Sequence, residues 1–263
     1  MEQLLSLHNE EDLFFKHAIT TDIERDAITR HVHQKYELIY YVSGDATSVV
    51  EGRKHKLRAG DLLLIRPSRY HLISFESSAT YERYNILFDP RALGIESVWR
   101  LDEGIEAVSL RTEPRAVDFF LKMELYCKRF DPPTFKKLAV SMIEELFCLL
   151  SILPTVAKST YQMAVSPPLE TVLRYINENL TVLKDVDEVA EKCFVSKSYL
   201  FRLFRQELME TPKKYITKKR LLMAREMIEN GTRPTAAFEL CSFEDYTTFY
   251  RNYISFFGQL PSK

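Results

Sequence analysis

The stretch "VDEVAEKCFVSKSYLFRLFRQE", residues 186–207, has the pattern of two short helices separated by a tight turn. Val186, Val189 and Ala190 form the apolar edge of the first helix, and Ala190 is small enough to let another helix cross closely. The letters KCFV make the turn, and the Ser196 hydroxyl can cap the next helix. A short helix, a tight turn and a capped second helix with a polar face are typical of a helix-turn-helix unit.

The second of these helices divides into an apolar and a polar face. Its inward face consists of Tyr199, Leu200, Leu203 and Phe204. The DNA contacts expected from this helix are Lys197, Ser198, Phe201, Arg202 and Gln206. In a helix-turn-helix unit this helix lies in the major groove, where arginine can bond guanine through two hydrogen bonds. Phe201 has two interpretations, contact with a thymine methyl group or packing under the neighbouring helix.

Basic side chains concentrate on this unit and on the helix after it. Residues 196–225 contain nine Lys and Arg and only two acidic residues, whereas the whole chain has a formal net charge of −1. A solvated helix face normally mixes the two signs, and a stripe of one sign is the footprint expected of a phosphate-binding surface. We therefore expect double-stranded DNA as a partner, with Lys213, Lys214 and Lys218 added to the contacts.

A long helix and a second unit follow. Residues 212–231 read "PKKYITKKRLLMAREMIENG", with proline at the start and glycine past the end, as helix boundaries prefer. Residues 234–261 then repeat the plan of a short helix, a turn at 241–244 and a second recognition-like helix from Asp245. The contacts expected from this helix are Tyr246, Thr247, Tyr250 and Arg251. The chain is therefore predicted to carry two helix-turn-helix units joined by a rigid helix.

Residues 169–263 resemble the DNA-binding domain of the AraC/XylS family of bacterial transcription regulators. The matching positions are Ala190, Ser196, Leu200, Arg202, Phe204, Pro212, Tyr215, Arg220, Ala224, Phe243, Asp245, Phe249, Arg251, Gly258 and Pro261. The resemblance implies that one chain reads two successive major grooves about one helical turn apart, one with each unit. Ser242, Phe238 and Tyr253 stand where the family usually has glycine, alanine and phenylalanine. These departures point to a repacked second unit, and whether that unit reads bases stays open.

The first 110 residues have a different pattern. Short runs rich in Tyr, Val, Ile and Leu alternate with Gly, Pro and Ser at 37–44, 47–52, 55–60, 61–67, 71–76 and 81–89. This pattern predicts an antiparallel β-barrel or sandwich. The first twenty residues, with Phe14, Phe15 and His17, could form an arm over the barrel mouth.

Two helices are predicted after the strands, at 115–130 and 132–153, because apolar residues recur there at three- and four-residue steps. The second helix either packs in its own domain or forms a dimer seam through Leu138, Met142, Leu146, Leu149 and Leu150. We therefore predict an α+β multidomain protein. Its parts are a β-barrel at 1–110, a dimerising helical pair at 111–153, a linker at 154–168 and an all-α domain at 169–263.

The stretch "HVHQKYELIYYVSG", residues 31–44, places His31, His33 and Glu37 on one face if it is extended. With the glycine that ends the stretch, these residues follow the spacing of the cupin metal pattern. His71 would be the fourth ligand, on a facing strand. The N-terminal region thus resembles the cupin-type sensor domain that is common in the AraC/XylS family, and this resemblance implies a cupin-like effector-binding barrel.

Three uses of these side chains stay open. A Zn, Fe or Mn ion would bind to His31, His33, Glu37 and His71. A small-molecule pocket would use the same four side chains, with Tyr41, to bind an effector. In the third, His33 and Glu37 only pair with their neighbours and stabilise the fold. Residues 66–69 lack the glycine of the cupin pattern, which favours an effector pocket without a metal or another cofactor.

These features favour a ligand-responsive, sequence-specific DNA-binding transcription regulator, with no catalytic residues. Besides DNA, the expected partners are a small-molecule effector and a second copy of the chain, and RNA polymerase is an open further partner. The alternatives are a metal-dependent cupin enzyme and a constitutive DNA-binding regulator whose barrel only dimerises. No apolar run approaches the roughly 20 residues of a membrane helix, and the four cysteines form no CxxC pair. We therefore expect a reduced, cytoplasmic protein.

Overall fold

The computed structural model divides the chain into two compact units, Met1–Met163 and Ala164–Lys263. The residues that it describes are 1–23, 28–31, 33–51, 53–67, 69–101, 106–153, 162–163, 166–208 and 210–261. Most of the predicted linker at 154–168 therefore lies outside the described residues.

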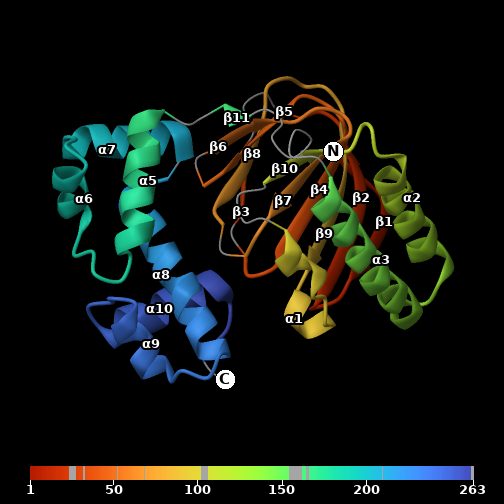
Figure 1. Cartoon of the computed structure of the whole chain (residues 1–263). Coiled ribbons are helices and arrows are strands. Elements are labelled where there is room, and N and C mark those ends of the chain that lie inside the picture. Colours follow the sequence, from red (N-terminus) through yellow and green to blue (C-terminus); the bar gives the residue numbers. More distant parts are fainter. Residues whose placement is uncertain are drawn as a thin grey trace. The chain divides into compact units, whose positions relative to one another are not determined.

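The first unit contains two antiparallel sheets (Figure 1). The six-stranded sheet has the order β1 (Glu2–Asn9), β2 (Leu13–Thr20), β9 (Tyr81–Phe88), β4 (Tyr36–Ser43), β7 (Asp61–Ile65) and β10 (Ala107–Ser109). The five-stranded sheet has the order β11 (Gln162–Met163), β6 (Arg53–Lys56), β5 (Ala46–Val50), β8 (His71–Phe75) and β3 (Ile28–His31).

The two sheets do not close into the predicted barrel. Among the described residues, no strand of one sheet pairs with a strand of the other. Closure needs hydrogen bonds all the way round, and the outer strands β10 and β3 offer only three and four residues. The prediction of a barrel is thus corrected to two separate sheets. The first twenty residues also differ from the expected arm, since they form the strands β1 and β2 and Phe15 is fully buried.

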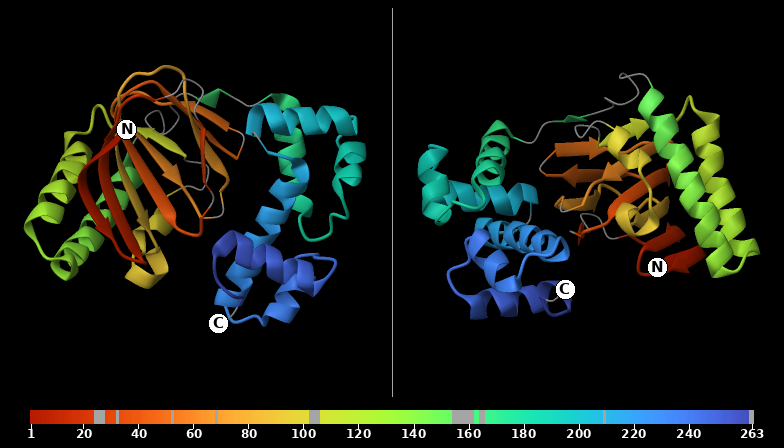
Figure 2. Two further views of the ribbon diagram at one scale, coloured as in Figure 1. Left: turned by 180° about the vertical axis from the view of Figure 1, so that it is seen from behind. Right: turned by 60° about the horizontal axis from the view of Figure 1, so that its bottom comes forward.

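Strand β4 lies inside the six-stranded sheet, and the side chains on both of its faces are buried. Side chains alternate along a strand, so Ile39 and Tyr41 join a core with Phe75 of the five-stranded sheet. Leu38 and Tyr40 point the other way and join the core formed with the helices. The unit therefore has three layers, which are the five-stranded sheet, the six-stranded sheet and a pair of helices (Figure 2).

The helices of the third layer are α2 (Pro114–Arg129) and α3 (Pro132–Ile152). They follow a short helix α1 (Pro90–Leu93) and a 3-10 turn at Ser97–Arg100. Glu124 of α2 accepts a hydrogen bond from the Tyr84 hydroxyl at 2.9 Å and lies 3.0 Å from His17 Nδ1, which ties the helix to the sheet.

The apolar stripe of α3 belongs in part to the core. Leu146 and Leu150 are fully buried against the six-stranded sheet and α2. Leu138, Met142 and Leu149 are half-buried. The core interpretation therefore holds for the inner part of the stripe.

The second unit is helical (Figure 1). Its helices are α5 (Pro167–Asn179), α6 (Val186–Lys192), α7 (Lys197–Leu203), α8 (Pro212–Glu229), α9 (Pro234–Leu240) and α10 (Tyr246–Phe257), with a π-helical turn at Phe204–Leu208. As predicted, the Ser196 hydroxyl caps α7 by accepting a hydrogen bond from the Tyr199 N–H at 3.2 Å. The pairs α6–α7 and α9–α10 are the two helix-turn-helix units, and α8 joins them.

None of the helices in the described part of the chain is both long enough and apolar enough to cross a bilayer.

Candidate functional site

A cavity of about 240 Å³ lies in the first unit, between side chains of β2, β4, β8 and β9. Its polar lining consists of Lys16, His33, Glu37, His71, Arg83 and Asn85. Its remaining walls consist of Phe14, Ile39, Ile73, Phe75, Tyr81 and Leu87. An apolar pocket with a few convergent polar groups is the usual form of a small-molecule site.

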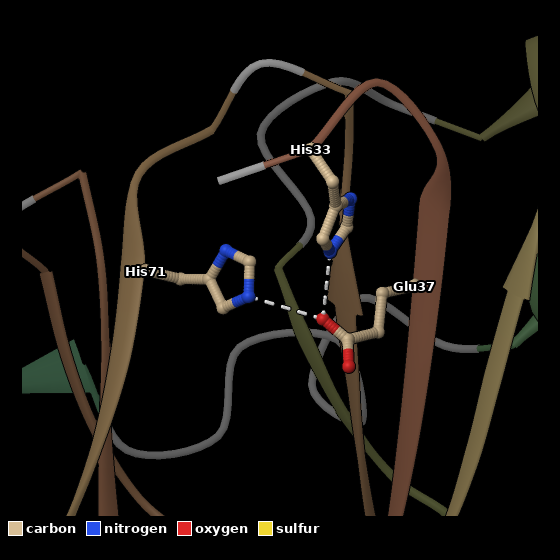
Figure 3. Close-up of side chains that lie close together, drawn as sticks. All are labelled: His33, Glu37 and His71. Carbon is tan, nitrogen blue, oxygen red and sulfur yellow. Dashed lines mark hydrogen bonds and ion pairs between the residues drawn. The ribbon is translucent and has the colours of Figure 1, made fainter. Parts of the chain in front are cut away.

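Glu37 is the centre of the polar cluster (Figure 3). Its Oε2 lies 3.0 Å from His33 Nε2 and 3.0 Å from His71 Nε2. Its Oε1 accepts a hydrogen bond from Asn85 Nδ2 at 2.8 Å. Burial raises the pKa of the Glu37 carboxyl, but hydrogen bonds from His33 and His71 outweigh burial and hold that pKa well below its usual range. Glu37 is therefore ionised at neutral pH.

The two imidazole rings are oriented by the backbone. His33 Nδ1 lies 2.9 Å from the Lys35 carbonyl oxygen, and His71 Nδ1 lies 3.0 Å from the Arg69 carbonyl oxygen. A carbonyl oxygen only accepts, so each Nδ1 carries the hydrogen and donates it. Each Nε2 then faces the Glu37 carboxylate, so the two rings and the carboxylate direct polar atoms toward one place.

His33, Glu37 and His71 fit the requirements of a divalent metal ion. One ligand atom from each of them lies within 4.8 Å of the others. Two imidazoles and a carboxylate suit Zn²⁺, Fe²⁺ or Mn²⁺, and a histidine that binds a metal usually donates its other N–H to a carbonyl or carboxylate, as both do here. An ion held there would act as a Lewis acid toward an oxygen atom of a bound molecule.

The structure brings together three of the five residues predicted to bind an effector, His33, Glu37 and His71. The backbone of His31 pairs with His71 in the sheet, but its side chain lies outside the described residues. Tyr41 differs from the prediction. It is 1% exposed, its ring lies 5.6 Å from the Tyr81 ring in the apolar core, and it is not among the residues that line the cavity.

Four lining residues with hydrogen-bonding side chains were not predicted from the sequence, namely Lys16, Tyr81, Arg83 and Asn85. Three of them alternate along β9, at the first, third and fifth positions of "YERYNILF". Alternation of this kind marks one face of a strand. The sequence does not show which face of β9 lines the cavity, because the opposite face, with Tyr84 and Ile86, is buried as well.

The predicted DNA contacts of the first helix-turn-helix unit lie mainly on the surface. Lys197, Ser198, Arg202 and Gln206 are exposed, and Phe201 is half-buried. The guanidinium of Arg202 lies over the Tyr199 ring, 5.0 Å from its centre.

The predicted contacts on α8 and α10 are divided in the same way. Lys213, Lys214, Thr247 and Arg251 are exposed, whereas Lys218, Tyr246 and Tyr250 are half-buried. The Lys218 ammonium lies 2.6 Å from the buried Glu210 carboxylate, so its charge is compensated locally.

Arg220 was counted in the basic stripe, but the structure places its guanidinium inside the domain. It donates to the carbonyl oxygens of Leu180 at 3.1 Å, Ser242 at 2.9 Å and Leu183. The Ser242 hydroxyl donates to the Thr181 carbonyl. These contacts tie the turn of the second helix-turn-helix unit to the loop that precedes the first helix-turn-helix unit. We call Arg220 and Ser242 the clasp. The stripe is therefore less cationic toward solvent than the sequence indicated.

Comparison with known proteins agrees with the division of the chain into two structural units. Residues 18–112 match the family described as AraC-like ligand binding domain, and residues 189–263 match the family described as helix-turn-helix domain. The chain is 22% identical to the HTH-type transcriptional activator RhaR of Cronobacter sakazakii over 244 residues, which cover 86% of this chain and 82% of that protein. It is 21% identical to the HTH-type transcriptional activator RhaS of Pectobacterium carotovorum, over 98% of this chain and 96% of the relative.

This chain is also similar to a solved structure of ToxT from Vibrio cholerae with an unsaturated fatty acid bound. The match covers 97% of this chain and 95% of the ToxT chain, with a TM-score of 0.40 and 10% sequence identity. The two domain families together match more than half of the chain, in the order that the two structural units have. The chain belongs to the AraC family of transcriptional regulators, with an N-terminal ligand-binding domain and a C-terminal helix-turn-helix domain that binds DNA.

Proposed function

We propose that this regulator binds its effector in the cavity around Glu37 and that the bound effector changes how the helical domain binds DNA. The observation that carries the proposal is the buried Glu37, held by His33, His71 and Asn85 at the wall of a cavity. A few convergent polar groups at the wall of a largely apolar cavity are the usual form of a small-molecule site, so the cluster supports ligand binding in addition to its contribution to the fold.

On DNA, α7 would read bases in one major groove and α10 would lie in the next. The exposed side chains of Lys197, Ser198, Arg202 and Gln206 support base contacts by α7, with Phe201 beside them. Lys213, Lys214 and Lys218 would contact phosphates. Tyr246, Thr247, Tyr250 and Arg251 would supply the contacts of α10.

The protein would act as a homodimer in the cytoplasm. Leu121 and Leu125 lie one turn apart on α2, and they are 56% and 49% exposed, which supports a seam with a second copy. RNA polymerase is a further proposed partner, because the relatives are activators. The same relatives support a regulator without enzymatic activity, so we do not extend the metal-binding chemistry of the cavity to a reaction.

The first test is selection of the full-length protein on a random duplex library, with binding followed against salt. We expect enrichment of two half-sites about one helical turn apart. Arg202→Ala should remove the enrichment at one of them, because a bidentate contact is worth about 1–3 kcal/mol of discrimination. Arg129→Ala, an equal loss of charge from the exposed end of α2, is the control and should change neither.

If Arg202→Ala enriches the same sequence as the unaltered protein, α7 is not the reading helix. Salt-sensitive binding without any enriched sequence would restrict the helical domain to phosphate contacts. No binding at low salt would contradict the proposed interface.

A further inference from the structure

The cavity lining carries more positive than negative charge. Lys16 of β2 and Arg83 of β9 line it with side chains that are only 19% and 13% exposed. They are neighbours on paired strands, since Lys16 lies opposite Asn85 and Arg83 opposite Ala18. Glu37 is the one carboxylate in the described lining, and it is already held by two imidazoles and an amide. Two cations thus face one anion before the two imidazoles are counted.

These two cations are paired with a residue outside the lining. Glu2 of the edge strand β1 accepts from Arg83 Nη2 at 2.5 Å and from Lys16 Nζ at 3.3 Å. The Glu2 side chain is 38% exposed, so its ion pairs are screened by solvent and weak. A carboxylate on a bound molecule could replace it, because that molecule would bring the anion to the same two cations from inside the cavity.

Two further atoms indicate a hydrogen-bonding group on the bound molecule. The Tyr81 hydroxyl and Asn85 Oδ1 are buried in the cavity wall, and neither has a hydrogen-bond partner among the described residues. Buried polar atoms are almost always hydrogen-bonded in folded proteins. The Glu37 carboxylate can only accept, which fixes the Asn85 nitrogen toward Glu37 and leaves the amide oxygen as an acceptor. The missing partner is therefore a donor, such as a hydroxyl.

The size of the cavity limits the molecule. About 240 Å³ is below the roughly 300–1,000 Å³ of sites for drug-sized ligands. The remaining walls of the cavity are apolar and include Ile73, Phe75 and Leu87. We infer, on the basis of the proposed function, that the effector is a small hydroxy acid. Its carboxylate lies between Lys16 and Arg83, and its hydroxyl donates to Asn85 Oδ1 beside Tyr81.

The test compares acids with neutral partners of the same shape. Thermal unfolding of the full-length protein is followed with 4-hydroxyphenylacetate against 4-hydroxyphenylacetamide, and with D-galacturonate against D-galactose. A ligand that binds only the folded state raises the unfolding midpoint. At least one acid should raise it by several degrees at millimolar concentration, and its neutral partner should not. The affinity of that acid is then measured by calorimetry.

Two variants separate the charge of Arg83 from the ion pair that it makes. Arg83→Gln and Glu2→Gln both remove the Arg83–Glu2 ion pair, so both lose the contribution of this pair to the stability of the protein. The proposal predicts opposite effects on the acid, at least tenfold weaker binding in Arg83→Gln and tighter binding in Glu2→Gln. Tyr81→Phe should weaken binding of the hydroxy acid several-fold and leave binding of its deoxy analogue, phenylacetate, unchanged.

The inference is overturned if no acid stabilises the protein, if the neutral partners stabilise it equally, or if the two variants change the affinity in the same direction. In each case the duplex selection still decides the proposed function. Enriched half-sites without acid binding would leave the regulator in place and remove only this class of effector.

Discussion

At the scale of single residues, Glu37 shows how a buried charge can be retained. Two imidazole nitrogens and an amide nitrogen meet its carboxylate within 3.0 Å. These contacts favour the ionised form more than burial disfavours it, so the pKa is lowered in the folded state. A carboxyl with a lowered pKa stabilises the fold above its ordinary pKa and loses that contribution as the pH falls toward the folded-state pKa.

Glu37→Gln should therefore change the stability and its pH dependence together. We expect a loss of about 1–3 kcal/mol at pH 7, because a neutral amide leaves buried partners poorly satisfied. We also expect the unfolding free energy of the unaltered protein to fall as the pH drops below the ordinary value of 4.5, and the variant to lose part of this slope. Urea unfolding at several pH values measures both. Equal slopes would show that Glu37 is not the titrating group.

Phe194 has a strained backbone conformation. It lies in the turn of the first helix-turn-helix unit with φ at 55°, and it is 96% exposed. The left-handed region disfavours side chains other than glycine, and no packing compensates for it here. Phe194→Gly should raise the unfolding free energy by up to about 1 kcal/mol, whereas Val182→Gly, at another exposed apolar position, should lower it or leave it unchanged. Destabilisation by Phe194→Gly would mean that the ring has a role in the folded domain.

At the scale of elements, the helical domain followed from the sequence more closely than the cavity did. The bounds of α8 and the caps at Ser196 and Asp245 depend on local signals. Proline and glycine mark the ends of α8, and each capping side chain accepts a hydrogen bond from the backbone N–H three residues later. The cavity depends on which strands face each other, and β4 and β9 are buried on both sides. Periodicity cannot assign a face to such strands.

The clasp leads to a prediction at this scale. Arg220→Ala should lower the unfolding free energy of the protein by about 1.5–3 kcal/mol, because hydrogen bonds from a charged group are lost. It should also weaken binding to a duplex with two half-sites far more than binding to a single half-site. Gel-shift titrations with both duplexes measure the difference. Arg225→Ala removes an ion pair with Glu229 and a cation–π contact with Phe257 but leaves the clasp intact, so it is the control. Equal weakening on both duplexes would contradict a role in holding the units together.

At the scale of the whole molecule, the third layer of the first unit is expected to join two copies of the chain. Leu121 and Leu125 leave an apolar strip on α2 that the described residues of this chain cover only in part. Replacing both by glutamate should convert a dimer to a monomer, because the seam would then bury charge. Sedimentation velocity gives the outcome. Lys122→Glu, an exposed neighbour that changes only charge, should remain dimeric, and an unchanged mass in the double variant would place the dimer elsewhere.

The position of β4 between two cores has a consequence for how this protein can evolve. A substitution on either face of β4 disturbs a packed layer, so few changes there are tolerated. Lys16 and Arg83 line the same cavity but are partly exposed, and their replacement leaves both cores intact. Descendants of this chain that respond to new molecules should therefore diverge first at Lys16 and Arg83, while β4 stays nearly constant.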